Sequence, residues 1–363
     1  MRVAVLVTGL ALLAACGGSG SEVGPRAAAS TIATNPPESS PSISSSPTTS
    51  SSITPSSTIS LNCQLAVYQV GRQKTGFIRF PGGTFVEDPA GAMVGVPAPT
   101  DRGAIALRRT IKQPELQGPG GPFYSKSAAR WLPVEREAVS PDGLRYAYAE
   151  PYWSTASYPS GSRVHVVNVV TGLDRVIYDV APYTVVSFAS EGIYVQQWST
   201  TGHPVRLALL NPAGGQPKQI FQSDTLTWTI VEAGAAWGKD VDSSSLTRLD
   251  LKTGNLQTWL HSPDSRPITI VAVDSAGAPF VIHLLNSPAQ ELFLVSEPNM
   301  ARVVVADFKP GDIRVAHDSH GIWFGGPELN TVSIYTPQSG MTRIATIGQD
   351  PGQEYLWVVG GCA

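Results

Sequence analysis

Beyond residue 61 the chain alternates short apolar runs with turns that contain glycine or proline. The runs are rich in valine, isoleucine, threonine and aromatic residues, and apolar side chains often occupy every second position. This period of two describes a strand with one buried face. Long patterns of period 3.6 are rare. The pattern predicts an all-β chain.

A glycine turn followed by a strand recurs along this part of the chain. The clear copies read SPDGLRYAY, ASEGIYVQQ, VEAGAAWGK, DSAGAPFVI and DSHGIWFGG, and a fainter copy reads FPGGTFVED. Their turn glycines, which lie 60, 49, 42, 43 and 44 residues apart, are Gly83, Gly143, Gly192, Gly234, Gly277 and Gly321. Near-constant spacing of this length indicates one supersecondary unit repeated many times.

A second series of turns lies between the first. Glycine and asparagine, which tolerate a positive φ, occupy Gly172, Gly214, Gly254, Asn299 and Gly340. Each repeat therefore offers four short antiparallel strands, which is a β-propeller blade. Six turns of the first series predict six blades. Seven is the alternative, because residues 64–70 and 354–361 are two further strand-like pieces that form a shared blade or belong to a seventh. The Pro/Gly-rich residues 91–130 are interpreted as an irregular insertion in the first blade.

Two of the repeats resemble known propeller families. SPDG followed by RYAY, and then by a strand pair ending in a TG turn, resembles the repeats of TolB-like propellers. GIWFGG followed by NTVSIYTPQSG resembles the repeats of the virginiamycin B lyase group. The resemblance spans about residues 131–347 at the level of single repeats. It implies the fold and leaves the activity open.

The first residues carry a targeting pattern. Arg2 precedes an apolar stretch over residues 3–13, which is too short to span a bilayer and is typical of a secretory signal. Residues 13–16, LAAC, resemble the lipobox of bacterial lipoproteins. The resemblance implies that residues 1–15 are removed and that Cys16 is acylated, for example with palmitate. Acyl chains would hold the protein at the extracytoplasmic face of the cell membrane. An ordinary signal peptide cut nearby is the alternative.

Residues 16–60 are interpreted as a disordered tether. Serine, threonine, proline, glycine and alanine dominate them, and such a composition buries too little apolar surface to fold. The predicted propeller domain therefore covers residues 61–363.

Charge and cysteine content narrow the class of protein. The formal net charge is −3, so the chain lacks the basic footprint of a nucleic-acid-binding protein. Of three cysteines, Cys63 and Cys362 remain if Cys16 carries lipid. A propeller must bring its ends together, and an exported domain can keep a disulfide. We therefore expect Cys63 to pair with Cys362.

The longer connections between strands are expected to share one face of the propeller and to form the ligand face. Aromatic and polar residues there suit a binding surface, although most large apolar residues serve packing. The candidates are Tyr152, Trp153, Tyr158, Trp198, His203, Asp240, Asp242 and His261.

His317 and His320 are weak candidates for a metal site. His317 breaks a column of apolar residues four positions before each turn glycine. A buried histidine with one satisfied hydrogen bond is the commoner explanation. The virginiamycin B lyase group holds a divalent metal with histidine on its ligand face, whereas these two histidines adjoin a turn assigned to the opposite face. Asp240 and Asp242 begin like a calcium loop, but the later positions do not match. The sequence predicts neither a metal nor a cofactor.

These patterns favour a membrane-anchored, monomeric lipoprotein whose propeller binds an envelope protein, peptide or glycan. A propeller enzyme of the lyase or hydrolase kind, acting on an extracellular small molecule, is the alternative, but no catalytic constellation is recognisable. A purely structural envelope scaffold is the third reading. No nucleic-acid partner is expected.

Overall fold

The computed structural model describes residues 61–69, 72, 74–92, 122–152, 159–262, 266–284, 290–308, 314–325, 331–346 and 356–363. These residues all lie in the second of two compact units, Pro55–Ala363. The predictions for the signal segment, Cys16, the tether, Trp153 and Tyr158 lie outside the described residues. Among those described, no helix has the length and apolar character needed to cross a bilayer.

The described elements are, in chain order, β1 (Gln64–Gln69), β2 (Lys74–Arg79), β3 (Thr84–Glu87), α1 (Pro89–Ala92), β4 (Phe123–Ser125), β5 (Arg130–Leu132), η2 (Arg136–Ala138), β6 (Arg145–Tyr152), β7 (Gly161–Asn168), β8 (Asp174–Asp179), β9 (Tyr183–Ala189), β10 (Gly192–Trp198), β11 (Pro204–Leu210), β12 (Lys218–Gln222), β13 (Leu226–Glu232), β14 (Ala235–Asp240), β15 (Ser245–Asp250), β16 (Leu256–His261), β17 (Ile268–Val273), β18 (Pro279–Leu284), β19 (Gln290–Glu297), β20 (Met300–Phe308), β21 (Arg314–Asp318), β22 (Gly321–Gly325), β23 (Thr331–Thr336), β24 (Gly340–Thr346) and β25 (Leu356–Cys362).

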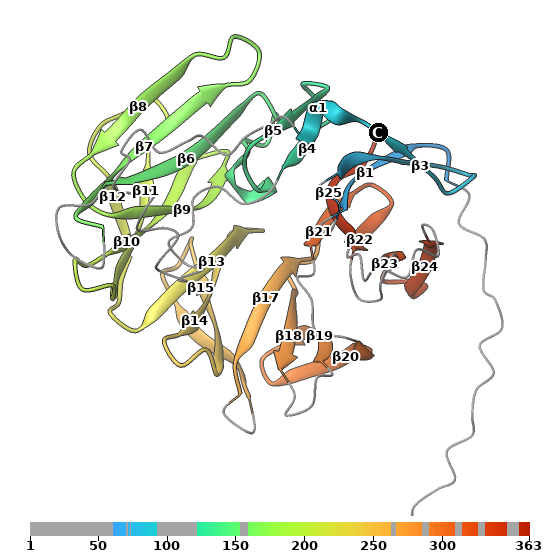
Figure 1. Cartoon of the computed structure of the whole chain (residues 1–363). Helices are drawn as coiled ribbons and strands as arrows, with labels where there is room; N and C mark the ends of the chain where they lie inside the picture. Colours follow the sequence, from blue (N-terminus) through green and yellow to red (C-terminus); the bar gives the residue numbers. More distant parts are fainter. Residues whose placement is uncertain are drawn as a thin grey trace, which may run out of the picture. The chain divides into compact units, whose positions relative to one another are not determined.

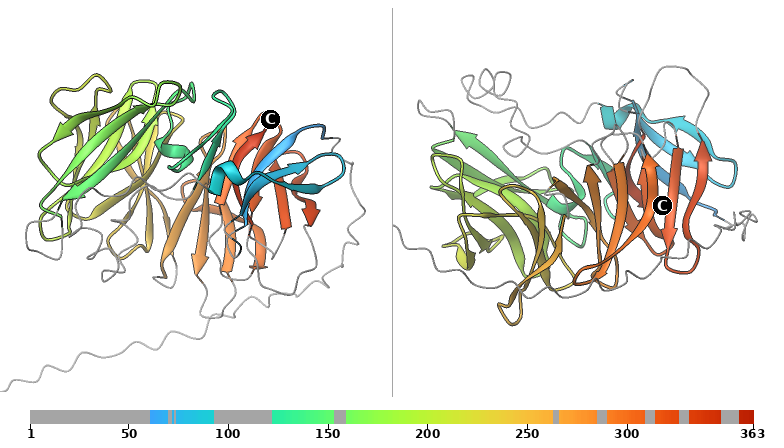
Figure 2. Two further views of the ribbon diagram at one scale, coloured as in Figure 1. Left: turned by 45° about the horizontal axis from the view of Figure 1, so that its top comes forward. Right: turned by 90° about the horizontal axis from the view of Figure 1, so that it is seen from below.

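The described strands form seven antiparallel sheets, which confirms the predicted all-β propeller and its repeat-level resemblance to propeller families. The blade count follows the alternative of seven rather than six. Five sheets have four strands: β25-β1-β2-β3, β9 to β12, β13 to β16, β17 to β20 and β21 to β24. The other two are β4-β5 and β6-β7-β8. Within this unit the sheets follow one another in chain order, and the inner strands β9, β13, β17, β21 and β25 each lie beside the next (Figures 1 and 2).

The ends of the unit share one sheet. The last strand, β25, is its inner strand and pairs with β1 through Leu65↔Cys362, Val67↔Val358 and Tyr68↔Trp357. The predicted disulfide between Cys63 and Cys362 is present, with Cα atoms 5.5 Å apart. The two strand-like pieces at the ends therefore form a shared blade.

The faint repeat copy belongs to the other series of turns. Gly83 lies between β2 and β3, the last two strands of their sheet. Gly172 likewise lies between β7 and β8, the last two strands of theirs, so Gly83 is equivalent to Gly172 and not to Gly143. Gly83 and Gly172 lie 89 residues apart, about two repeats. The two-stranded sheet β4-β5 occupies that interval, at the end of the stretch interpreted as an insertion, whereas residues 93–121 are outside the described part.

Apolar side chains pack between neighbouring sheets. Three residues after their turn glycines, Val195, Trp237, Phe280 and Phe324 are fully buried, as the period of two predicts. Phe280 and Phe324 meet edge to face across two sheets, with ring centroids 5.4 Å apart. Burying such a side chain contributes roughly 2–3 kcal/mol each. The repeat pattern thus encodes the core between the blades.

Candidate functional site

The predicted ligand-face residues that the structure describes lie on the face opposite the glycine turns. Trp198 and Asp240 end the second strands of their sheets, and His261 ends a fourth strand. Tyr152 ends β6, which follows the Gly143 turn and pairs across it with Val139. Antiparallel strands place these ends together, while the turns at Gly192, Gly234 and their equivalents lie at the other ends. We call the first side the loop face and the second the turn face.

The structure does not gather these residues into one cluster. Trp198 is buried, and its indole N–H donates to the Thr184 hydroxyl at 3.0 Å. Tyr152 has the Arg163 guanidinium over its ring at 5.8 Å. His203 and Asp242 are exposed. Trp198 therefore serves packing.

Asp240 and His261 meet through Ser245. Asp240 Oδ1 accepts the backbone N–H of Ser245 at 3.2 Å, and the Ser245 hydroxyl lies 2.9 Å from His261 Nδ1. Asp240 also accepts the Ser244 amide at 2.8 Å. The carboxylate thus caps the turn after β14 and contacts the serine amide rather than the histidine. This is not the order of contacts in a Ser-His-Asp relay.

A different group of side chains converges at the loop-face ends of inner strands. Arg314 begins β21, and its guanidinium pairs with Glu135 and lies 5.0 Å from the ring centre of Trp357. Trp357 belongs to β25 and lies 5.6 Å from the Tyr68 ring of β1. The side chains of Arg314 and Glu135 are 36% and 40% exposed. We call Tyr68, Glu135, Arg314 and Trp357 the loop-face cluster.

A second polar group lies toward the turn face. Glu232 ends β13, and its Oε1 is 3.4 Å from Arg136 Nη2 of η2 and 3.4 Å from His317 Nε2 of β21. Glu137 lies 3.9 Å from Arg136 Nη1. We call Arg136, Glu137, Glu232 and His317 the turn-face cluster. It unites residues from three separate parts of the chain.

His317 stays neutral in this cluster. Burial and, to a smaller extent, the Arg136 charge lower its pKa to about 4, although Asp318 acts in the opposite direction. His317 Nε2 is buried and makes no hydrogen bond.

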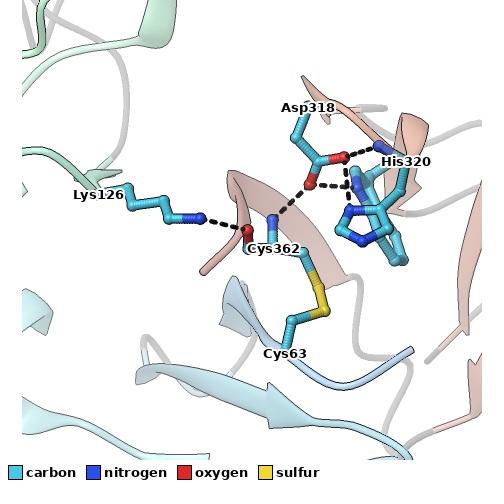
Figure 3. Close-up of a disulfide and its surroundings, with 6 residues drawn as sticks. Cys63, Lys126, Asp318, His320 and Cys362 are labelled. Atoms are coloured by element: carbon cyan, nitrogen blue, oxygen red, sulfur yellow. Dashed lines mark hydrogen bonds and ion pairs between the residues drawn. A yellow bond between two sulfur atoms is a disulfide. The ribbon is translucent and has the colours of Figure 1, made fainter.

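His317 and His320 do not share a site. His320 lies on the exposed turn, where its Nδ1 is 3.2 Å from Asp318 Oδ1 (Figure 3). In the described parts of the chain no group of three histidine, cysteine, aspartate or glutamate residues is placed to hold a metal ion.

Asp318 belongs to the closure of the ring. Its Oδ2 accepts the Cys362 amide at 2.6 Å and the Trp323 indole N–H at 2.9 Å, beside the disulfide (Figure 3). Lys126 donates to the Cys362 carbonyl at 3.2 Å. The turn after β21 therefore supports β25, the strand that closes the ring.

Sequence reasoning found His317 but missed its partners. The break in the apolar column was the available signal, since the equivalent Val139, Phe188, Ile230 and Val273 are all buried. Arg136 and Glu232 come from chain positions far from His317 and follow no motif. Only the closed ring brings them together.

No protein-family model and no curated relative matches the chain. Similar solved structures include a chain of the nidogen/laminin complex, with 9% identity, a TM-score of 0.38 and coverage of 82% of this chain and 96% of that one. Virginiamycin B lyase from Staphylococcus aureus has 8% identity and a TM-score of 0.38, over 81% and 94% of the two chains. An auxiliary nutrient binding protein from Bacteroides thetaiotaomicron has 9% identity and a TM-score of 0.38, over 61% and 62%. Scores this low carry no argument about activity, and the fold assignment rests on strand topology.

Proposed function

We propose that the chain is a lipoprotein anchored through Cys16 at the extracytoplasmic face of the cell membrane, and that its propeller binds a protein, peptide or glycan of the envelope. The lipobox-like LAAC sequence supports the anchor. The disulfide between Cys63 and Cys362 supports an oxidising compartment, because disulfides persist outside the reducing cytosol.

The observation that carries the binding role is the loop-face cluster. Arginine, tryptophan and tyrosine are the residue types that contribute most to binding energy at interfaces. Here the three types lie together, with the Arg314 guanidinium over Trp357 and partly exposed. The ion pair with Glu135 is accessible to solvent, so its net stabilisation is small and a partner can replace it. The cluster is therefore a suitable anchor for a partner.

Affinity capture tests the binding role. The full mature chain, extracted in mild detergent, serves as bait for envelope proteins and glycans. We expect Arg314→Ala and Trp357→Ala to lose a partner that the wild type retains. Arg248→Ala is the matched control, because Arg248 also lies over tryptophan rings, at 5.9 and 5.7 Å, within another blade. Equal capture by all variants would contradict a role for the loop-face cluster.

Labelling tests the anchor. In cells given a palmitate analogue, the wild type should be labelled and sediment with membranes, while Cys16→Ser should lose both properties. A wild-type protein that is secreted without label would show that an ordinary signal peptide operates.

A further inference from the structure

The turn between β7 and β8 exposes large apolar side chains on the turn face (Figure 1). Val170 and Leu173 flank the central TG of this turn, and their exposed fractions are 66% and 68%. Leu144, which is also exposed, adjoins them, because its carbonyl oxygen accepts the Val169 amide at 2.9 Å. The equivalent turn between β15 and β16 reads KTGN instead of VTGL, so the turn itself does not require apolar residues. We call Leu144, Val170 and Leu173 the apolar tip.

Arginine side chains lie beside the apolar tip. Arg130 is exposed, and its Nη1 donates to the Val169 carbonyl oxygen at 2.7 Å, so this guanidinium contacts the backbone of the tip. Arg145 and Arg175 each lie within two residues of a leucine of the tip. Arg175 is exposed, and the Arg145 side chain is 43% exposed. Solvent therefore reaches all three arginines.

Two carboxylates lie in the same two turns. Asp142 Oδ2 is 3.8 Å from Arg145 Nη2. Asp174 Oδ2 accepts the Tyr148 hydroxyl at 2.8 Å, and its Oδ1 lies 2.9 Å from His165 Nδ1. Three guanidinium groups against two carboxylates leave a positive excess around the apolar tip. A tip that is both aliphatic and positively charged matches an anionic lipid surface, where acyl chains lie beneath negatively charged headgroups.

The chain enters the described part of the protein on the same face. Cys63, next to the first strand, is bonded to Cys362 beside the turn after β21 (Figure 3). Lys126 donates to the Cys362 carbonyl oxygen, and the neighbouring Ser125 hydroxyl donates to the carbonyl oxygen of Gly143 at 2.9 Å. These contacts lead along the turn face from the entry point to the apolar tip. A lipid anchor before residue 61 would therefore bring the turn face to the membrane.

We infer that the turn face docks on an anionic phospholipid surface, with the apolar tip among the acyl chains and Arg130, Arg145 and Arg175 at the phosphate groups. Guanidinium groups bind phosphate well, and exposed aliphatic side chains gain from leaving water. The orientation rests on the proposed anchor at Cys16, whereas the contact itself needs no acyl chain. The loop-face cluster then points away from the membrane, toward an envelope partner.

The contact is expected to be weak and reversible. Few aliphatic side chains take part, and even a single myristoyl chain gives only marginal membrane binding. The turn face therefore orients the domain and does not replace the acyl anchor. A Cys16→Ser protein would still separate from membranes on dilution.

Vesicle binding tests the inference. Residues 16–363 with Cys16→Ser, made without the signal segment, carry no acyl group, so binding reports the protein surface alone. Sedimentation with phosphatidylglycerol vesicles at high lipid concentration should exceed that with phosphatidylcholine vesicles and should fall as salt is added. No sedimentation with phosphatidylglycerol, or equal sedimentation with both lipids, would overturn the inference. Palmitate labelling of the native chain decides the anchor separately.

Variants locate the contact. Val170→Ser/Leu173→Ser should weaken vesicle binding by about tenfold or more, because both side chains lose their transfer into lipid. Val180→Ser is the matched control, since Val180 follows the other end of β8, on the loop face, and is 68% exposed like Leu173. Circular dichroism checks folding, and Leu173→Ser alone decides if the double variant does not fold. Binding of the tip variant equal to that of Val180→Ser would refute docking through the apolar tip.

Discussion

Asp318 reaches across the closure of the ring and accepts the backbone amide of Cys362 at 2.6 Å. Asp274 occupies the equivalent turn position in the preceding blade, three residues before its glycine. Both carboxylates use Oδ1 to accept amides of their own turns, those of Ala276 and Ala278 for Asp274. Only Asp318 uses its second oxygen to bind the closing strand. The turn after β21 therefore helps to hold β25, the strand that closes the ring, in place.

Asp318→Asn should destabilise the protein by about 2–3 kcal/mol in urea unfolding. If the amide oxygen keeps capping the turn, the new NH₂ group faces two donors, the Cys362 amide and the Trp323 indole N–H. Asp274→Asn should cost less than about 1 kcal/mol, because its remaining oxygen can cap the turn alone. Equal losses for the two variants would show that Asp318 does not support closure.

Removing the disulfide should weaken the same closure. The bridge joins residues 299 apart, so the loop-entropy model gives roughly 5–6 kcal/mol as an upper value, and about 2–5 kcal/mol is usual. The free energy of unfolding of the double variant Cys63→Ser/Cys362→Ser, measured in urea, should be lower than that of the wild type by this amount. A reductant should lower the stability of the wild type and leave the variant unchanged. If the double variant is combined with Asp318→Asn and the losses of stability do not add, the disulfide and the Asp318 hydrogen bond stabilise the closure together.

Much of this architecture can be predicted from the sequence, and the reasons differ between features. The four-stranded repeat is visible because Trp237, Phe280 and Phe324 recur at a fixed distance from turn glycines and are buried for the same reason. The disulfide follows from ring closure. The seventh sheet was missed because β4 and β5 have three residues each, too short for a period-two pattern.

The polar clusters were beyond prediction for a different reason. Glu232 and Arg136 follow no motif, and 96 residues separate them in the chain. Arg314 and Trp357 likewise belong to different sheets. Contacts between inner strands depend on how the blades close, which repeat spacing does not define. Trp198 shows the opposite kind of difference. The sequence suggested it as a binding residue, and the structure buries it in packing.

His317 should make stability depend on pH. Its pKa in the folded protein is about 4, below the ordinary value of 6.5, so between these values the unfolded chain binds a proton that the folded protein does not. Stability from this residue is therefore complete above pH 6.5 and is lost as the pH falls toward 4, by about 3 kcal/mol at most.

Urea unfolding of the wild type and of His317→Val across this pH range measures the effect. The variant should lose less stability on acidification, and at neutral pH it should be at least as stable as the wild type, because valine matches the apolar column. Parallel pH profiles for the two proteins would mean that His317 is hydrated in the folded state.

The two glycines before Cys362 allow the closing strand to pack. A Cβ on Gly361 would lie 3.0 Å from Asp318 Cβ, and one on Gly360 would lie 3.0 Å from the Tyr124 carbonyl oxygen. Gly361→Ala should therefore push the strand away from Asp318 and cost about 1–3 kcal/mol in urea unfolding. Gly82→Ala is the control, because its nearest neighbour is the Thr84 hydroxyl at 3.5 Å, an ordinary contact. If Gly361→Ala is as stable as Gly82→Ala, the contact between β25 and Asp318 tolerates a side chain, and small residues at the end of β25 are not needed to close the ring.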